Sequence, residues 1–328
     1  MSNKHFTDDL VEAIQKDNTL NENAKNIVLR NLAKLKDTKV NILITGATGC
    51  GKSSTINALF NTEKAKVGQG VDPETMEISK HELDNIVLFD SPGLGDGKEA
   101  DLRHAKGITA KLYEKDKDGN LLIDLVLVLL DGSSRDLGTS FELIDNVIIP
   151  NLGNDKKRLM VAINQADMAM KGRGWNKEKN QPEPELIKFL DEKVASTKKR
   201  IKEATGVDVE PIYYAAGYKE DSDAQNPYNL SKLLVHILRH TKPEKRVVFA
   251  QDINKDAKMW KDDDRLEDYQ KEIKETFMES VRKNAEAGAE AGAGIGRALG
   301  GEKGEAIGRA AGAVIGGLVG AAKSLWPF

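Results

Sequence analysis

The chain has 328 residues, a formal net charge of −3 and 31% charged residues. This near-neutral balance does not indicate a nucleic-acid-binding surface, and the length allows one large or two modest domains with a hydrophobic core. The single cysteine, Cys50, excludes an internal disulfide framework, so we expect a cytoplasmic protein. Residues 1–20 show no signal peptide, and no run of roughly eighteen apolar residues predicts a conventional membrane span.

The N-terminal segment, residues 1–38, is predicted to form two helices, because apolar side chains recur at helical spacing within residues 6–14 and again within 27–35. From residue 40 onward, short apolar runs alternate with helical patterns. The predicted strands are 40–45, 85–90, 123–131, 158–164 and 209–215. This alternation favours an α/β fold, with a mostly parallel sheet, helices on both faces and a ligand site beyond the carboxyl ends of the strands.

Residues 46–53 fit the phosphate-binding pattern G-x-x-x-x-G-K-[ST] between a predicted strand and a predicted helix. We expect backbone N–H groups of this loop and the helix N-terminus to hold phosphates, Lys52 to reach the β- and γ-phosphates, and Ser53 to ligate Mg²⁺. The alternative is a strand-turn-helix that binds nothing. The predicted nucleotide-binding residues here are Gly46, Thr48, Gly49, Cys50, Gly51, Lys52, Ser53 and Ser54.

Two later segments are predicted to sense the phosphates. Residues 90–93 fit D-x-x-G at a strand end, where Asp90 would hold Mg²⁺ through water and the Gly93 N–H would meet the γ-phosphate. Thr75, just before a strand, is expected to complete the Mg²⁺ shell when GTP is bound; the alternative is an ordinary threonine at a strand start. The predicted catalytic residues are Lys52, Thr75, Asp90 and Gly93, and the predicted metal-binding residues are Ser53, Thr75 and Asp90.

Residues 164–167, Asn-Gln-Ala-Asp, end a strand and resemble N-K-x-D, a motif that reads guanine. Asp167 would accept from the guanine N1–H and amine, a pair of donors that adenine lacks, and a buried carboxylate left unpaired would disfavour the wrong base. Asn164 belongs to the same motif. Gln165 replaces the usual lysine, so packing on the base should be weaker. After the next strand, the Ala216 N–H is predicted to meet guanine O6. The alternative for residues 164–167 is a capped strand end.

Residues 230–240 are predicted to close the nucleotide-binding domain, 39–241, as a helix. Residues 242–284 are expected to form a charged helical extension in which residues 262–264, three aspartates, make a solvated face. His236 and His240 share a helix face, where an exposed surface is favoured over a zinc site. Residues 171–184 are expected to be an insertion, with a partner-binding loop as the alternative.

The tail, residues 285–328, carries glycine at every fourth position from Gly288 to Gly320. Small residues at this spacing let helices approach closely, and the break near residues 300–303 suggests a helical hairpin with arms 285–299 and 305–322. Three interpretations stay open: self-association or docking, contact with a membrane surface through the Lys- and Trp-containing end, and a disordered tail.

The order of the motifs resembles that of translation-factor-related GTPases, within them the Era-like and septin-like branch, and in particular the YfjP-type bacterial GTPase family. The resemblance covers residues 38–241 and is carried by GATGCGKSSTINALF at 46–60, VDPET at 71–75, DSPGLGDG at 90–97 and NQAD at 164–167. It implies a P-loop GTPase domain that binds GTP and GDP and hydrolyses GTP with Mg²⁺, flanked by N- and C-terminal helical extensions.

Two departures from related GTPases bear on mechanism. Leu94 stands where Ras-like enzymes carry the glutamine that orients water, and Gly49 stands where potassium-activated relatives carry asparagine. The loop looks instead like that of septins and immunity-associated GTPases, which associate across the nucleotide face. We therefore expect a nucleotide-dependent switch that is slow as a monomer and is activated by homodimerisation or by a partner.

Two other classes of function stay open. The first is a septin- or dynamin-like assembly protein whose tail engages a membrane, which would place the protein at the periphery of the inner membrane. The second is an ATPase, or a nucleotide-binding scaffold without turnover. A preference for ATP would contradict the role given to Asp167.

Overall fold

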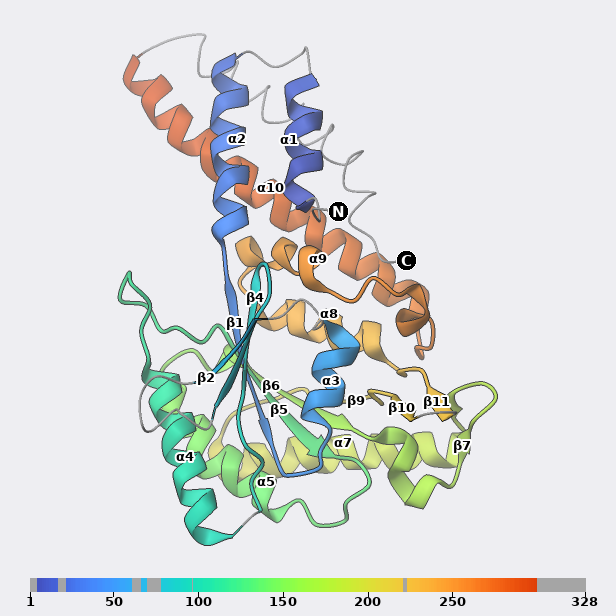
Figure 1. The fold of residues 1–328 in the computed structure, drawn as a ribbon. Coiled ribbons are helices and arrows are strands. Elements are labelled where there is room, and N and C mark those ends of the chain that lie inside the picture. Colours follow the sequence, from blue (N-terminus) through green and yellow to red (C-terminus); the bar gives the residue numbers. More distant parts are fainter. Residues whose placement is uncertain are drawn as a thin grey trace.

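The computed structural model describes residues 5–16, 22–60, 66–69, 78–95, 97–220 and 223–299. Its centre is a seven-stranded sheet with the order β2-β3-β4-β1-β5-β6-β9 (Figure 1). The strands are β1 (Val40–Gly46), β2 (Lys66–Gln69), β3 (Ser79–Glu82), β4 (Ile86–Asp90), β5 (Leu125–Asp131), β6 (Leu159–Asn164) and β9 (Ile212–Tyr213). Strands β4, β1, β5, β6 and β9 are parallel, whereas at one edge β3 runs antiparallel to β4 and β2 runs antiparallel to β3. The predicted α/β fold is confirmed.

The strand predicted over residues 209–215 is shorter in the structure, where β9 contains only Ile212 and Tyr213. Pro211 precedes it and has no N–H to donate to the neighbouring strand. Beyond Tyr214 the chain pairs elsewhere, because Ala215 and Tyr228 exchange backbone hydrogen bonds of 3.0 and 2.9 Å. The chain therefore leaves the sheet just after β9, at the edge where the nucleotide site is predicted.

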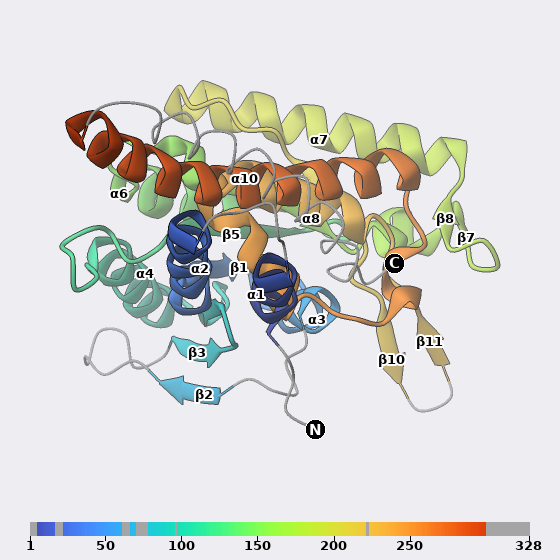
Figure 2. The ribbon, with the colours of Figure 1, turned by 90° about the horizontal axis from the view of Figure 1, so that it is seen from above.

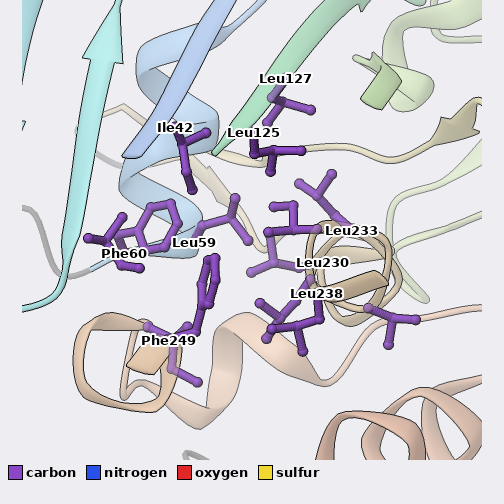
Figure 3. Packing of buried hydrophobic residues seen from close by; sticks show 14 of the residues in the cluster. Ile42, Leu59, Phe60, Leu125, Leu127, Leu230, Leu233, Leu238 and Phe249 are labelled. Carbon is purple, nitrogen blue, oxygen red and sulfur yellow. The ribbon is translucent and has the colours of Figure 1, made fainter. Parts of the chain in front are cut away.

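Side chains of the central strands alternate between two hydrophobic clusters, one on each face of the sheet. In β5, Leu125 and Leu127 belong to the first cluster, and Val126 and Val128 to the second. Burial on both faces explains why this strand is almost wholly apolar in sequence. Figure 3 shows part of the first cluster, in which the labelled residues are Ile42, Leu59, Phe60, Leu125, Leu127, Leu230, Leu233, Leu238 and Phe249.

Helices cover both faces of the sheet, as predicted (Figures 1 and 2). The first face is covered by α3 (Lys52–Leu59), α8 (Leu230–His240), η5 (Pro243–Val248), α9 (Phe249–Asp252), η6 (Ala257–Trp260) and α10 (Leu266–Leu299). The second is covered by α4 (Lys98–Tyr113), α5 (Gly138–Glu142), η2 (Leu143–Ile148), α6 (Ile149–Asn151) and α7 (Pro184–Thr205). Short helical turns η3 (Lys156–Arg158) and η4 (Ala166–Gly172) flank β6.

The N-terminal segment forms the two predicted helices, α1 (Phe6–Lys16) and α2 (Glu22–Asp37). Both stand at one end of the molecule, where α2 packs against α10 (Figures 1 and 2). Asn85, just before β4, joins this end to the sheet: its Nδ2 donates to the carbonyls of Leu35, Lys36 and Thr38 at 3.1, 3.2 and 2.8 Å. The helix end of α2 is thus capped by a buried side chain from the sheet.

The C-terminal extension is helical, as predicted, but it is not only a charged surface. Trp260, Tyr269, Ile273 and Phe277 are buried in the first hydrophobic cluster together with residues of the sheet. Helix α10 continues without a break across residue 284, where a boundary was predicted. The division into 1–38, 39–241, 242–284 and 285–328 stays a prediction, and residues 300–328 of the tail lie outside the described residues.

The prediction that residues 262–264 form a solvated face holds only for Asp264, which is exposed, because Asp262 and Asp263 are partly buried. Asp263 Oδ1 accepts from Lys232 N at 3.2 Å in the first turn of α8, and Asp264 pairs with Lys232 Nζ at 2.7 Å. The carboxylate of Asp263 is thereby a cap for the N-terminus of α8, where helix N–H groups need acceptors. Burial raises the pKa of Asp263 to about 7.

The predicted insertion, residues 171–184, includes a two-stranded hairpin of β7 (Trp175–Asn176) and β8 (Gln181–Pro182). Asn180 at its turn donates through Nδ2 to Asp262 Oδ2 at 2.9 Å. His236 and His240 are partly buried rather than exposed, and burial lowers the pKa of His236 to about 3. Within the described residues there is no group of three or more His, Cys, Asp or Glu side chains that could hold a metal ion, and no helix with the length and apolar character that crossing a membrane requires.

Candidate nucleotide site

The predicted site residues come from loops at one edge of the sheet. The loop of residues 46–53 follows β1, Asp90 ends β4, Asn164 ends β6, and Ala216 follows β9. These strands are parallel neighbours or near neighbours, so their carboxyl ends share an edge, as predicted. Thr75, the predicted switch threonine, lies outside the described residues.

The phosphate-binding loop is shaped by glycines that no other residue could replace. Gly46 has φ 153° and Gly51 has φ 86°. A Cβ atom at Gly46 would lie 2.3 Å from Leu129 O, and one at Gly51 would lie 2.2 Å from Asn164 Nδ2. Lys52, at the start of α3, folds back over the loop and donates to Gly46 O and Ala47 O at 3.3 and 3.2 Å. A phosphate oxygen in the loop would take the place of these carbonyls as the acceptor for the ammonium group.

Three other predicted loop residues differ in exposure. Cys50 is fully buried in the first hydrophobic cluster, and burial raises the pKa of its thiol. The Cys50 side chain therefore packs the loop against the core, and only the Cys50 backbone is able to contact a nucleotide. Ser53 and Ser54 are exposed at the start of α3, so their hydroxyl groups are accessible to a ligand or a metal ion.

Asp90 presents a carboxylate oxygen to the same region. Its Oδ1 is buried and has no hydrogen-bond partner among the described residues. Burial raises the pKa of Asp90, while the positive charge of Lys52 acts in the opposite direction. A buried carboxylate oxygen without a donor is costly. Asp90 and the Ser53 hydroxyl thus fit a hydrated Mg²⁺ ion, which prefers oxygen ligands and keeps several waters.

Gly93 and Leu94 lie directly against the phosphate-binding loop. A Cβ atom at Gly93 would lie 2.3 Å from Thr48 Oγ1. Thr48 N donates to Leu94 O at 3.0 Å, and Leu94 N donates to Gly46 O at 3.3 Å. The Leu94 side chain is only 6% exposed, within the second hydrophobic cluster. An apolar, buried side chain cannot orient an attacking water.

Asn164 joins the two ends of the site. Its Nδ2 donates to Cys50 O at 3.0 Å, and its Oδ1 accepts from Ala216 N at 3.0 Å. Gln165 makes a second bridge, donating through Nε2 to Gly49 O at 2.7 Å. The predicted contact between the Ala216 N–H and guanine O6 differs from this geometry, because the Asn164 side chain takes that N–H. Asn164 therefore links the phosphate-binding loop to the segment that contains Ala216.

A cavity of about 270 Å³ lies between the phosphate-binding loop and the residues predicted to read guanine. Its lining residues are Gly51, Ser54, Asn164, Gln165, Asp167, Met168, Ala216, Gly217 and Tyr218. Asp167 is 9% exposed, and burial raises the pKa of its carboxyl group. Gln225 Nε2 donates to Asp167 Oδ2 at 3.2 Å. The sequence contained no sign of Gln225, which lies in a separate hairpin of β10 (Tyr218–Glu220) and β11 (Asp223–Gln225).

Residues 41–165 match a protein-family model described as "50S ribosome-binding GTPase". The matched segment begins in β1, includes the phosphate-binding loop and Asp90, and ends at Gln165, two residues before Asp167. The chain contains a P-loop GTPase domain. This domain binds GTP and hydrolyses it, and the fold and site geometry agree with that activity. A comparison with curated proteins finds no match.

Several solved structures are similar to this GTPase domain. The G domain of the T. maritima FeoB iron transporter has 19% identity and a TM-score of 0.34, covering 62% of this chain and 98% of that one. A probable GTP-binding protein engB has 21% identity and a TM-score of 0.36, covering 61% and 98%. Toc33 from Arabidopsis thaliana, in complex with GDP and Mg²⁺, has 16% identity and a TM-score of 0.44, covering 74% and 99%.

Proposed function

We propose that this protein is a GTP-dependent switch that hydrolyses GTP to GDP and phosphate with Mg²⁺. Lys52, Gly93 and the N–H groups of the phosphate-binding loop hold the phosphates, while Ser53, Asp90 and Thr75 hold the metal ion. Asp167 reads guanine, and Asn164 and Ala216 support it. A Mg²⁺ ion held by these residues would supply positive charge to neutralise the charge that develops on the phosphate oxygens.

The observation that carries this proposal is the cavity shared by Gly51, Ser54, Asp167 and Ala216. One wall comes from a phosphate-binding loop and another from a buried carboxylate, which can accept two N–H groups of guanine and none of the ring nitrogens of adenine. A ligand that binds both the phosphate-binding loop and the Asp167 carboxylate has phosphates at one end and a guanine at the other.

We infer slow hydrolysis by the isolated monomer, with the missing catalytic group supplied by a second copy of the chain or by another protein. The support is Leu94, which is apolar and buried where a water-orienting side chain is needed. The resemblance to the YfjP-type, Era-like and septin-like GTPases is part of this proposal, since related GTPases associate across the nucleotide face. The proposal also includes a cytoplasmic location for the protein.

The test is the GTP hydrolysis rate per molecule over a wide range of protein concentration. A rate that rises with concentration supports activation by self-association, whereas a flat, low rate points to another protein as the activator. A potassium-stimulated rate that does not depend on concentration would contradict both. The matched truncation ends at Leu299, because ending the chain at Asn284 would cut α10 in two.

A second candidate function is that of an assembly protein whose tail engages a membrane surface. The supporting observation is that α10 continues as a helix through Gly288, Gly292 and Gly296, the start of the glycine repeat. Liposome flotation with GTP, with GDP and with the chain ending at Leu299 tests it. Flotation that needs the tail supports this function, and the same flotation without residues 300–328 argues against it.

A further inference from the structure

We propose that Gln225 is a built-in competitor for guanine, which limits nucleotide affinity by occupying one oxygen of Asp167. This inference rests on the proposed reading of guanine by Asp167. Gln225 Nε2 donates to Asp167 Oδ2 at 3.2 Å, the kind of N–H donor that guanine N1 or its amine would offer to the same oxygen. The two donors cannot use one lone pair of that oxygen together.

The Asp167 carboxylate gives this contact its strength. Asp167 is 9% exposed, and burial raises the pKa of its carboxyl group, which means that the ionised form lacks solvent. The hydrogen bond from Gln225 stabilises the ionised form and lowers the pKa again. A donor to a buried carboxylate contributes more than an exposed neutral pair. Guanine must therefore displace an interaction that already stabilises the pocket.

The Gln225 side chain has a place to which it can move. It lines a second cavity of about 240 Å³ together with Lys177, Asn180, Tyr218 and Asp262. Tyr218 also lines the 270 Å³ cavity that holds Asp167. Gln225 and Tyr218 thus stand between the two cavities, where they are paired across the β10–β11 ladder. A polar second cavity can accept the displaced amide without leaving it unsatisfied.

The backbone around Gln225 sets where the amide reaches. Gly217, in a left-handed conformation with φ 73°, lies so close that a Cβ atom there would be 2.4 Å from Gln225 O. Strands β10 and β11 pair only with each other among the described strands. A hairpin of this kind is marginal without support. The contact at Gly217 holds the Gln225 backbone at one end of the hairpin, so displacing the amide from Asp167 would require a rotamer change of the side chain.

The competition should differ between bases. Guanine offers N1–H and an amine, and it needs both oxygens of Asp167. Hypoxanthine offers only N1–H, so it can use one oxygen while Gln225 keeps the other. Gln225 therefore weakens the binding of GDP more than that of inosine diphosphate, because only the second donor of guanine competes with the amide for the lone pair of Oδ2 that Gln225 uses.

The test measures the dissociation constants of GDP and inosine diphosphate for the full chain and for Gln225→Met, which keeps the side-chain length and removes the donor. We expect GDP to bind about three- to tenfold more tightly to the variant, and inosine diphosphate to change less than about twofold. Gln181→Met, an exposed glutamine on the other hairpin, is the matched control and should change neither.

An unchanged or weakened affinity of Gln225→Met for GDP overturns the proposal, and weakening would assign Gln225 to holding Asp167 in position. Gln225→Ala distinguishes loss of the donor from misfitting of the methionine. In an Asp167→Ala background, Gln225→Met should have no effect on GDP binding. If the unmodified chain binds GDP and ADP equally well, guanine reading by Asp167 is itself wrong, and the proposal falls with it.

Discussion

The phosphate end and the base end of the nucleotide site differ in the groups that make their contacts. At the phosphate end, the contacts of Lys52 and Thr48 are with backbone carbonyls, and Asp90 Oδ1 has no donor among the described residues. At the base end, side-chain amides of Asn164 and Gln225 make the contacts. The proposed phosphate contacts therefore come mainly from the backbone of the loops after β1 and β4, whereas the proposed base contacts come from side chains of distant segments.

The largest effect is expected at the phosphate end. Lys52→Ala removes the only side-chain cation of the phosphate-binding loop and should lower GTP hydrolysis by about a hundredfold or more, since it removes a charge that stabilises the transferring phosphoryl group. The measurement is phosphate release at saturating GTP and Mg²⁺. Lys188→Ala, an exposed lysine on α7, is the control and should behave like the unmodified chain. Near-normal turnover in Lys52→Ala would remove the phosphate end from the proposed site.

At the base end, Asp167→Asn should change the base preference of the site from guanine to xanthine. The variant offers one acceptor and one donor in place of two acceptors, so GDP binding should weaken roughly a hundredfold or more, while xanthosine diphosphate, with N1–H and a carbonyl, should gain affinity. Competition against a labelled nucleotide measures both. Asp191→Asn, exposed on α7, should alter neither affinity. Equal loss of both nucleotides would mean that Asp167 supports the pocket without reading the base.

Asn164 connects the phosphate end and the base end of the site through its side-chain hydrogen bonds. Asn164→Ala removes the hydrogen bonds to Cys50 O and from Ala216 N in a fully buried position, so the free energy of unfolding should fall by about 2–3 kcal/mol. Urea unfolding at constant nucleotide concentration measures it. Gln165→Ala, which loses one exposed bridge to Gly49 O, should cost less than about 1 kcal/mol. A similar decrease in the free energy of unfolding in the two variants would argue against Asn164 as the main link between the two ends of the site.

The smallest effect is expected from pH. Burial raises the pKa of Asp167, and guanine needs the ionised carboxylate, so binding should release a proton at low pH. GDP affinity should be constant above the raised pKa and should fall as the pH drops through it, approaching about tenfold per pH unit. Measurement without Mg²⁺ leaves Asp90 out of metal binding. The pH dependence that survives in Asp167→Asn comes from the GDP phosphates, and an identical profile in both chains would contradict this role of Asp167.

Much of the phosphate end was predictable from sequence because its residues are neighbours. The loop of residues 46–53 fixes its glycines and Lys52 within one short stretch, and the alternation of strands and helices predicted the sheet edge where it lies. The strand end at Asp90 was predicted by the same pattern, since consecutive parallel strands bring their carboxyl ends together.

The base end was harder to predict because its contacts join distant residues. Gln225 meets Asp167 through a short hairpin with no hydrophobic period to signal its place. The run at residues 262–264 looked like a solvated face because its partner, the N-terminus of α8, is invisible in the local sequence. Ile273 and Phe277 are four residues apart, as on one helix face, but only the structure shows that they belong to the core beneath the sheet.

The packing of α2 against α10 sets the order in which this protein can fold during synthesis. Leu35 of α2 lies in the same hydrophobic cluster as Phe277 of α10, and the two helices are in contact. Helix α2 begins at Glu22 and α10 at Leu266. At about 5–20 residues per second, the ribosome takes roughly 10 to 50 s to make the chain between them. Helix α2 therefore emerges well before α10 and waits for it with apolar surface exposed.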